Sequence, residues 1–529
     1  MSKILITILS HDIDIIGSSH LICSLKEENP HHEISVLTYS DLLTYFSAHA
    51  GISEVYSIDR NFAKGVAESS LYSDSFALNS FFNSIAPCYD IHWNKVINYS
   101  NDTVASYLCS MMTTDDMTGT SISKLGSAQT SNVWSNYLNF VSPNIEEDII
   151  PSHLVRHYMS SVPFRREGKK IKLNNEFTQV ATTNFSRIRQ SMPTSLPTYM
   201  VGISLSPSFG GDSICKDSIS EVIEALEESE NFKPVLILSG SENEKNLVSR
   251  LNERFGNKLI SINTDRTAFP SVALNLDFLV SQSNEHLMFA DAIETRTIEL
   301  RSSTKMKRRS SLVNSDNFVI YQGEELLSND VLVLLNQETN SELPISSMHS
   351  SNKVYMTTED DYGFLMTQIR GPVDLEEELR YHIERSYHFQ LMGFTPNEQF
   401  ITHLRDSVDP VALSTFITQS KDELTNSVKL LLATLRSLKG AKQSQGNLKN
   451  FVLYLDQIIT KAKSTSITRG AIGLFEGRIE SINSENPEEN MKLIEKHLFS
   501  LKSDLQALTN LLTDLLSVEQ KEDTTEATR

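Results

Sequence analysis

The 529-residue chain contains little cysteine. Its four cysteines, Cys23, Cys88, Cys109 and Cys215, lie far apart and form no CxxC pair, so the sequence predicts neither a zinc site nor a disulfide framework. It also lacks an apolar run of about 18 residues, so no membrane-spanning helix is expected. The first residues, MSKILITILSHD, lack the basic region and cleavage site of a signal peptide. We therefore expect a cytoplasmic protein.

Basic residues are also in short supply. The chain has 47 Lys and Arg against 67 Asp and Glu, a net charge of −20, so nucleic acid is not expected as the main partner. Neither GxSxG nor GxxxxGK[ST] occurs, which excludes serine hydrolases of that class and P-loop kinases. The acidic pairs Asp115-Asp116 and Asp360-Asp361 do not follow a strand at an expected ligand-binding edge. We predict no metal and no cofactor.

Short apolar strands alternate with helical stretches along two parts of the chain, residues 1–160 and 195–340. Runs such as KILITIL and YMVGISLS predict buried strands, and each is followed by a helical pattern. This alternation indicates βαβ units and parallel sheets. The sequence thus predicts an α/β fold with two Rossmann-like halves, in which ligands bind at the carboxyl ends of the strands.

Strand signals largely disappear after about residue 365. Seven apolar residues then follow one another at intervals of four and three, as in an a/d seam: Ile494, Leu498, Leu501, Leu505, Leu508, Leu512 and Leu515. We predict a helical bundle over 365–518 and a disordered tail over 519–529. The heptad segment 491–518 either closes on the chain's own helices or pairs with another chain, which would allow self-association.

The first strand and the turn after it resemble the ADP-heptose:lipopolysaccharide heptosyltransferase family. The family reads K-I-L-I-x-R-x-S-x-x-G-D-[VI], and residues 3–15 read KILITILSHDIDI, so Ser10 and Asp14 match without a gap while Ile8 and Ile13 differ. WNKVINYSND likewise matches the family's D-x-V-I-N-L-S strand. The resemblance implies that Asp14 is the catalytic base. The alternative for Asp14, and for Asp12 beside it, is helix capping.

The second half resembles the family over FPSVALNLDFLVSQSNEHLMFADAIETRTIEL. Six residues hold the family pattern: Asp277, Leu279, Val280, Ala290, Ala292 and Thr295. In the ligand-contacting part, Ser283 replaces an Asp and Asn284 a Thr, while His286 stands two positions before the family's His. The resemblance implies that Ser283, Asn284 and His286 contact the donor.

Two further segments are predicted to hold the donor. The loop SPSFGGDSICKD, residues 206–217, offers the Ser208 hydroxyl, close backbone approach at Gly210 and Gly211, and the Lys216 cation, where the family holds a diphosphate. The alternative is an ordinary βα loop. Glu242 and Glu244 follow ILSGS, where a family glutamate holds the ribose or base. The alternative is charge in a first helical turn, which the helix dipole favours.

The sharpest basic cluster is RSSTKMKRR, residues 301–309. It follows the last strand of the second half and contains five cations, Arg301, Lys305, Lys307, Arg308 and Arg309. Phosphorylated lipid A core acceptors could be attracted by such a loop, so we expect Arg301, Lys305, Lys307 and Arg308 to contact the acceptor. The alternative is a solvated loop.

Together the resemblance implies a GT-B fold, with two Rossmann-like domains facing across a cleft, plus the helical bundle. The expected domains are an acceptor-side domain, 1–190, and a nucleotide-sugar-side domain, 195–345. The implied function is an inverting glycosyltransferase that moves a heptose-like sugar from a nucleotide diphosphate to a lipopolysaccharide-core glycolipid or a protein, with peripheral membrane contact left open. The alternative, favoured by the substitutions at 283–288, is a non-catalytic relative whose bundle binds a partner.

Overall fold

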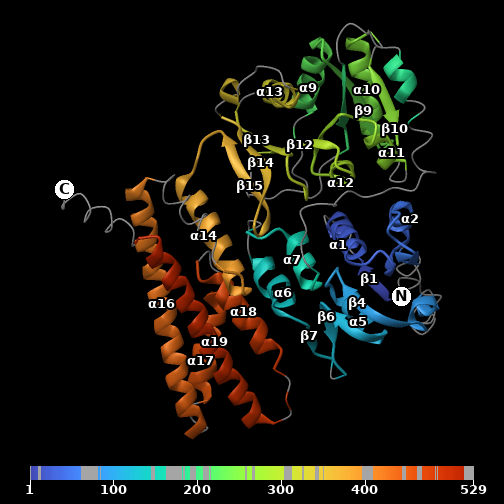
Figure 1. The fold of residues 1–529 in the computed structure, drawn as a ribbon. Coiled ribbons are helices and arrows are strands. Elements are labelled where there is room, and N and C mark those ends of the chain that lie inside the picture. The colour runs from blue at the N-terminus through green and yellow to red at the C-terminus, as the bar shows by residue number, and fades with distance from the viewer. Residues whose placement is uncertain are drawn as a thin grey trace. The chain divides into compact units, whose positions relative to one another are not determined.

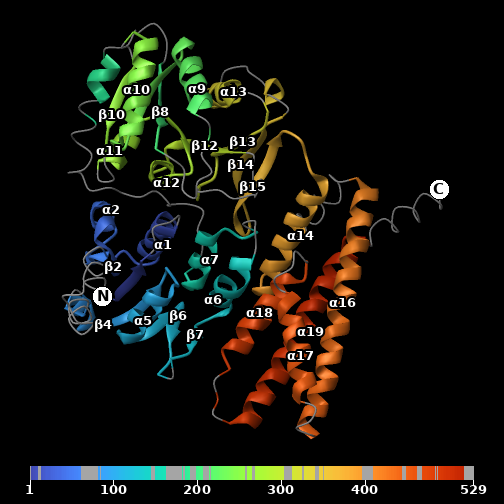
Figure 2. The same ribbon diagram turned by 180° about the vertical axis from the view of Figure 1, so that it is seen from behind.

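The computed structural model describes residues 2–516 apart from a set of gaps. The gaps are residues 10–13, 61–81, 84, 125, 145–148, 163–181, 183–184, 191–197, 207–213, 215, 257–258, 265–267, 303–311, 325–326, 340–344, 349–350, 396–408, 444–447, 462–466, 483 and 485. The chain forms two compact units (Figures 1 and 2). The α/β unit comprises Met1–Thr118 and Ser160–Pro372, and the helical unit comprises Gly119–Met159 and Val373–Arg529.

The first sheet of the α/β unit has five parallel strands. They are β1 (Lys3–Ile8), β2 (Glu33–Tyr39), β3 (Glu54–Ile58), β4 (His92–Asn98) and β5 (Thr113–Thr118), in the order β3-β2-β1-β4-β5. Its described helices are α1 (Asp14–Glu28), η1 (Ser40–Leu42), α2 (Leu43–Ala48) and α5 (Thr103–Met111). Strand β1 is buried from Ile4 to Ile8, as expected when helices cover both faces. The order reverses between β1 and β4, the kind of point at which parallel sheets bind ligands.

The second sheet has eight strands in the order β10-β9-β8-β11-β12-β13-β14-β15. The parallel strands are β8 (Tyr199–Ser204), β9 (Phe232–Leu238), β10 (Ile260–Asn263), β11 (Phe278–Gln282), β12 (Arg296–Ser302) and β13 (Phe318–Gln322). The antiparallel hairpin of β14 (Lys353–Asp360) and β15 (Gly363–Arg370) extends one edge. Here the order reverses between β8 and β11.

Helices cover both faces of the second sheet. They are α9 (Lys216–Glu228), α10 (Glu242–Arg254), α11 (Phe269–Ala273), α12 (Glu285–Ala292) and α13 (Leu327–Glu338), followed by η6 (Ile345–Ser347). Side chains alternate along β8, so that Val201 packs with residues of α9 and α10 while Met200 packs with residues of α11 and α12. Gly202 lies on the second face, where a Cβ would come within 2.5 Å of Leu276 Cδ1 and displace that side chain.

The two halves of the α/β unit share one apolar cluster. It contains Ile4 and Leu21 from the first half and Met200 and Ala290 from the second. The rings of Tyr45 and Phe289, one from each half, lie 4.7 Å apart. The two halves expected as separate domains, 1–190 and 195–345, therefore form one compact unit.

The C-terminal helices form a bundle, as predicted. They are α14 (Leu375–Leu391), α16 (Pro410–Gln443), α17 (Leu448–Lys461), α18 (Arg469–Glu480) and α19 (Pro487–Asp514), and the last four run side by side in both views (Figures 1 and 2). The seam residues Leu498, Leu501, Leu505, Leu508, Leu512 and Leu515 are all buried. They pack in one cluster with residues of α16 and α18, so this chain's own helices cover the seam. Among the described helices, none is both long and apolar enough to cross a membrane.

Residues 119–159 pack with the bundle rather than with the first sheet, which differs from the expected domain 1–190. They form β6 (Thr120–Ile122), β7 (Ala128–Thr130), α6 (Val133–Asn136), η2 (Tyr137–Val141), η3 (Ser142–Asn144) and α7 (Ser152–Met159). Tyr137 OH lies 2.8 Å from His388 Nδ1 of α14. A Cβ at Gly473 of α18 would lie 2.9 Å from Phe140 O, so a glycine lets α18 approach η2 closely.

Candidate functional site

The carboxyl ends of β1 and β4 meet at the switch point of the first sheet. Asp14 is the first residue of α1, directly after the loop that follows β1, while its side chain and residues 10–13 lie outside the described residues. After β4, Asn101 has a positive φ of 59°, and its N–H donates to Asn98 Oδ1. Asp102 caps α5 by accepting from Ala105 N at 2.8 Å. The position of Asp14 is compatible with both of its predicted roles, catalytic base and helix cap.

At the switch point of the second sheet, both ends of the glycine loop after β8 are attached to the neighbouring segment. Asn284 Nδ2 donates to Ser206 O at 2.9 Å, before the loop. Ile214 N donates to Gln282 Oε1 at 2.7 Å, after the loop. Ser208, Gly210 and Gly211 lie between these two points, outside the described residues. The chain thus holds the loop at the edge where parallel sheets bind ligands.

Asn284 supports this edge from inside the protein. It is the N-cap of α12, where its Oδ1 accepts from Leu287 N at 3.1 Å and from Ser281 Oγ at 2.9 Å. Its Nδ2 also donates to Ser204 Oγ at 3.2 Å, and the residue is only 1% exposed. These contacts make Asn284 a residue that positions the loops; its predicted contact with the donor stays a prediction.

Glu242 and Glu244 differ in their surroundings. The Glu242 side chain is 83% exposed and pairs with Lys245 at the surface. Glu244 is buried at the third position of α10, in a capping box with Ser241. Of the two, only Glu242 offers its carboxylate to solvent.

The Glu244 carboxylate accepts hydrogen bonds from residues after both β8 and β9. Its Oε1 accepts from Ser206 Oγ at 3.0 Å and from Ser239 Oγ at 2.8 Å, and its Oε2 accepts from the backbone N–H groups of Ser239, Gly240 and Ser241. Burial alone would raise the pKa of Glu244, but these hydrogen bonds outweigh it and lower that pKa. The ionised side chain joins the ends of two adjacent strands.

His286 is buried beneath the same edge. Its Nδ1 lies 2.8 Å from Ser204 Oγ, and its ring packs on Phe269 with centroids 4.4 Å apart. Burial lowers the pKa of His286 to about 4, while the Glu244 carboxylate acts weakly in the opposite direction. The imidazole is therefore neutral near pH 7 and supplies no positive charge to a phosphate group.

Arg301 lies at the end of β12, next to β11. Its Nε donates to Glu299 Oε1 at 2.8 Å, and its Nη2 lies 3.5 Å from Ser283 Oγ. Ser283 directly follows β11, so this guanidinium faces the same carboxyl edge as the loops described above. Lys305, Lys307, Arg308 and Arg309 lie outside the described residues, as does the side chain of Lys216, which begins α9.

Six residues that join the strand ends at this edge were not predicted from the sequence. They are Ser204, Ser206, Ser239, Ser281, Gln282 and Glu299, and each lies in or just after a strand of the second sheet. A signal for them exists, because β8, β9 and β11 end in SLS, SG and SQS. Serines that recur at the ends of adjacent parallel strands predict a hydroxyl-rich edge.

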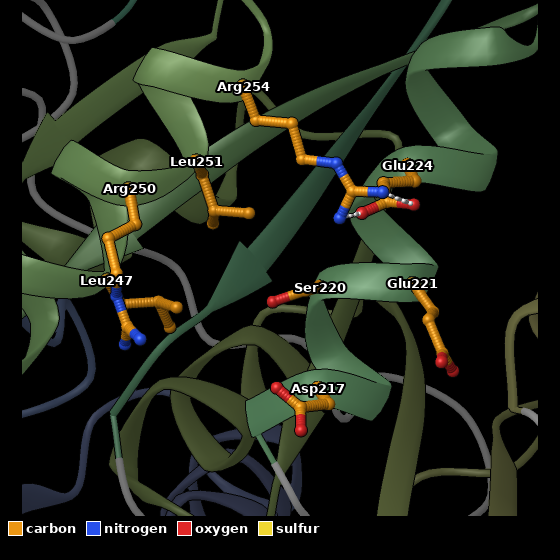
Figure 3. Close-up of a pocket in the computed structure, with 8 residues that line it drawn as sticks. All are labelled: Asp217, Ser220, Glu221, Glu224, Leu247, Arg250, Leu251 and Arg254. Carbon is orange, nitrogen blue, oxygen red and sulfur yellow. Dashed lines mark hydrogen bonds and ion pairs between the residues drawn. The ribbon is translucent and has the colours of Figure 1, made fainter.

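A groove of about 640 Å³ lies between α9 and α10, away from the switch point. Figure 3 shows the Arg254 guanidinium of α10 facing Glu224 of α9, with Asp217 and Ser220 along the same side. Arg254 and Glu224 form an ion pair, and Leu247 and Leu251 line the opposite wall. Among the described residues, no group of three or more His, Cys, Asp or Glu side chains is arranged to hold a metal ion.

Comparison with known proteins gives matches among solved structures. No protein-family model matches the chain, and no curated protein matches it. A glycosyl transferase family 9 protein from Veillonella parvula DSM 2008 is 13% identical, with 66% of this chain and 93% of that chain covered and a TM-score of 0.44. E. coli heptosyltransferase WaaC, solved with ADP-2-deoxy-2-fluoro heptose, is 12% identical, with 64% and 99% covered and a TM-score of 0.44. E. coli ADP-heptose lps heptosyltransferase II is 13% identical, with 64% and 100% covered and a TM-score of 0.44. At this level, similarity alone assigns no function to the chain.

Proposed function

We propose that this protein is an inverting glycosyltransferase that binds a nucleotide diphosphate sugar beside β8 and β11. The observation that carries the proposal is the attachment of the glycine loop, through Asn284 and Gln282, to the carboxyl end of β11. These two contacts place Ser206 and Ile214, the described residues that flank the loop, beside the end of β11. The N-termini of α9 and α12 follow the strands of this switch point and favour an anion there.

The donor contacts follow from exposure and position. Ser208, Gly210, Gly211 and Lys216 are the proposed contacts of the diphosphate, since backbone N–H groups and a cation stabilise the charge that develops as it departs. Glu242, exposed at the start of α10, is the proposed contact of the ribose hydroxyls. Glu244 binds the backbone of residues 239–241, the loop that leads into α10 and Glu242.

Asp14 is the proposed general base at the switch point of the first sheet. An acceptor hydroxyl attacks the anomeric carbon and forms a new C–O bond while the bond to the diphosphate breaks. The hydroxyl proton passes to the Asp14 carboxylate, and the single displacement inverts the anomeric centre. A heptose-like sugar, a lipopolysaccharide-core or protein acceptor, and acceptor contacts from Lys305, Lys307 and Arg308 are the finer parts of this proposal.

Binding and turnover of nucleotide sugars test the proposal separately. We expect ADP-sugars or UDP-sugars at millimolar concentration to raise the melting temperature of the full chain. Asp14→Asn should keep that shift and lower turnover by about 100- to 10,000-fold, the range for loss of a general base. Asp12→Asn is the matched control and should retain turnover. The proposal is wrong if no nucleotide sugar stabilises the wild-type chain.

A non-catalytic binding protein is the second candidate, because Asn284 and His286 turn inward. Both side chains are 1% exposed and contact Ser204 rather than solvent. Under this hypothesis the fold binds a nucleotide or a partner without transfer. Stabilisation by nucleotide sugars, with no turnover in the presence of phosphorylated glycan acceptors or protein acceptors, is the result that selects it.

A further inference from the structure

We propose that Arg301 binds the diphosphate of the donor and that Glu299 is a positioning residue for its guanidinium. The inference rests on the proposed function and assigns Arg301 to the donor, whereas the sequence suggested acceptor contact. It follows from three observations: the buried partner of Arg301, its place beside Ser283, and the contrast with Arg296 on the same strand.

Glu299 fixes the guanidinium from below. The two residues stand two positions apart in β12 and therefore project from the same face of the sheet. The Glu299 side chain is 0% exposed and that of Arg301 is 19% exposed. Their 2.8 Å contact uses Arg301 Nε. An arginine held in this way loses little side-chain entropy when it binds a phosphate.

The Nη side of Arg301 faces the switch-point edge. Its Nη2 lies 3.5 Å from the hydroxyl of Ser283, the residue that connects β11 to the N-cap of α12. The N-terminus of α12 adds its positive dipole end to this edge. The one carboxylate in the first turn of α12 is that of Glu285. Planar guanidinium groups recognise phosphates through two parallel N–H donors, which suits a diphosphate.

Arg296 shows what an ordinary surface arginine looks like on the same strand. It begins β12 at the amino edge, its side chain is 49% exposed, and it pairs with Glu338 of α13. Exposed pairs of this kind contribute little to binding or stability. The pair of Arg301 with a fully buried carboxylate is different, because burying a charge is costly unless it is well paired. Arg296 is therefore a matched control for Arg301.

Titration calorimetry with the full chain tests the inference. The probes are ADP, UDP, AMP and pyrophosphate. We expect Arg301→Gln to weaken binding of the nucleotide diphosphate by about 10- to 100-fold, from the loss of a charge-assisted contact, and to weaken AMP much less. Arg301→Lys should recover only part of the affinity, because a lysine lacks the two-pronged geometry. Arg296→Gln should bind like the wild type.

Glu299→Gln tests the positioning role. The glutamine keeps a hydrogen-bond acceptor but loses the charge that pairs with the guanidinium. We therefore expect diphosphate affinity to fall by about three- to tenfold, less than for Arg301→Gln, with AMP affinity little changed. Arg301→Gln removes the cation that pairs with a buried carboxylate, which destabilises the fold. If Arg301→Gln does not fold, diphosphate affinity is measured on the double variant Glu299→Gln/Arg301→Gln, which carries neither charge. Its melting temperature shows whether it is folded.

The outcomes separate the two proposals. Equal diphosphate affinity in the wild type and in folded Arg301 variants overturns the role of Arg301 and leaves the proposed function standing. Binding of pyrophosphate through Arg301, without binding of ADP or UDP, keeps the anion site and overturns the nucleotide donor. A wild-type chain that binds none of the probes overturns both.

Discussion

The two switch points of the α/β unit are built differently. At the first sheet, Asp102 caps α5 and Asn98 binds Asn101 N through local contacts, while one side chain, Ser100, joins the ends of β1 and β4 by accepting from Leu9 N. At the second sheet, the side chains after β8, β9 and β11 bond to one another, so that Asn284 and Glu244 each join two segments. The comparison teaches that buried polar side chains join more segments on the proposed donor side, while the proposed chemistry depends on one carboxylate, Asp14, that begins a helix.

The caps Asn284 and Asp102 give the largest expected contrast in stability. Asn284→Ala removes a buried cap and its hydrogen bonds to Ser206 O, Ser204 Oγ and Ser281 Oγ, so we expect the free energy of unfolding to fall by about 3 kcal/mol. The stabilisation by nucleotide sugars should fall with it. Urea denaturation, with and without ligand, measures both effects. A loss below about 1 kcal/mol would show that Asn284 contributes no more to stability than an ordinary N-cap such as Asp102.

Glu244 and Glu242 sharpen the comparison within α10. Glu244→Gln replaces one carboxylate oxygen with an NH₂ group. That group faces either the backbone N–H donors or the hydroxyls of Ser206 and Ser239, so we expect the free energy of unfolding to fall by about 2 kcal/mol. Glu242→Gln should leave stability unchanged, because the residue is exposed, and should weaken nucleotide binding. Melting temperatures and calorimetry on the two variants distinguish the roles. Equal effects on stability would contradict the assignment.

Acid should destabilise the second edge through His286. The unfolded imidazole takes up a proton near pH 6.5, whereas burial lowers the pKa of the folded His286 to about 4. The unfolded state therefore binds more protons between these values, and stability falls as pH drops through this window, by about 2 kcal/mol at pH 4.5. Urea midpoints from pH 7.5 to 4.5 should fall less steeply for His286→Gln than for the wild type. Burial raises the pKa of Asp291 to about 7 and acts with the opposite sign, but equally in both proteins.

Asp102→Ala gives the smallest expected effect. The cap contact with Ala105 N is local to α5, so its loss should cost about 1 kcal/mol, the usual value for an N-cap. Binding of nucleotide sugars should be unaffected, because the residue lies at the first sheet. A loss as large as that for Asn284→Ala would remove the contrast between the two edges.

Much of the fold could be predicted because parallel strands are long apolar runs. The segments KILITI, EISVLTY and FLVSQ are strands as expected, and helices follow from Leu375 onward, whereas residues 365–370 of the expected bundle belong to strand β15. The place of Ser283 could also be predicted, since a residue directly after a parallel strand lies at the carboxyl edge.

The direction of the polar side chains could not be predicted. Spacing places Asn284 and Glu244 after their strands, but only the contacts with Ser204, Ser206 and Ser239 turn them inward. The helical partner of residues 119–159 was missed for a similar reason. It depends on close approach at Gly473, more than 300 residues further along the chain, and helical periodicity does not encode it.

The helical unit is assembled from two separate stretches of chain. The polypeptide passes between the units at Thr118–Gly119, at Met159–Ser160 and at Pro372–Val373. Deletion of everything after Pro372 would therefore not give the α/β unit alone. It would strip the partners from Trp134, Tyr137 and Val141, which are buried in the intact protein, and give an aggregation-prone fragment.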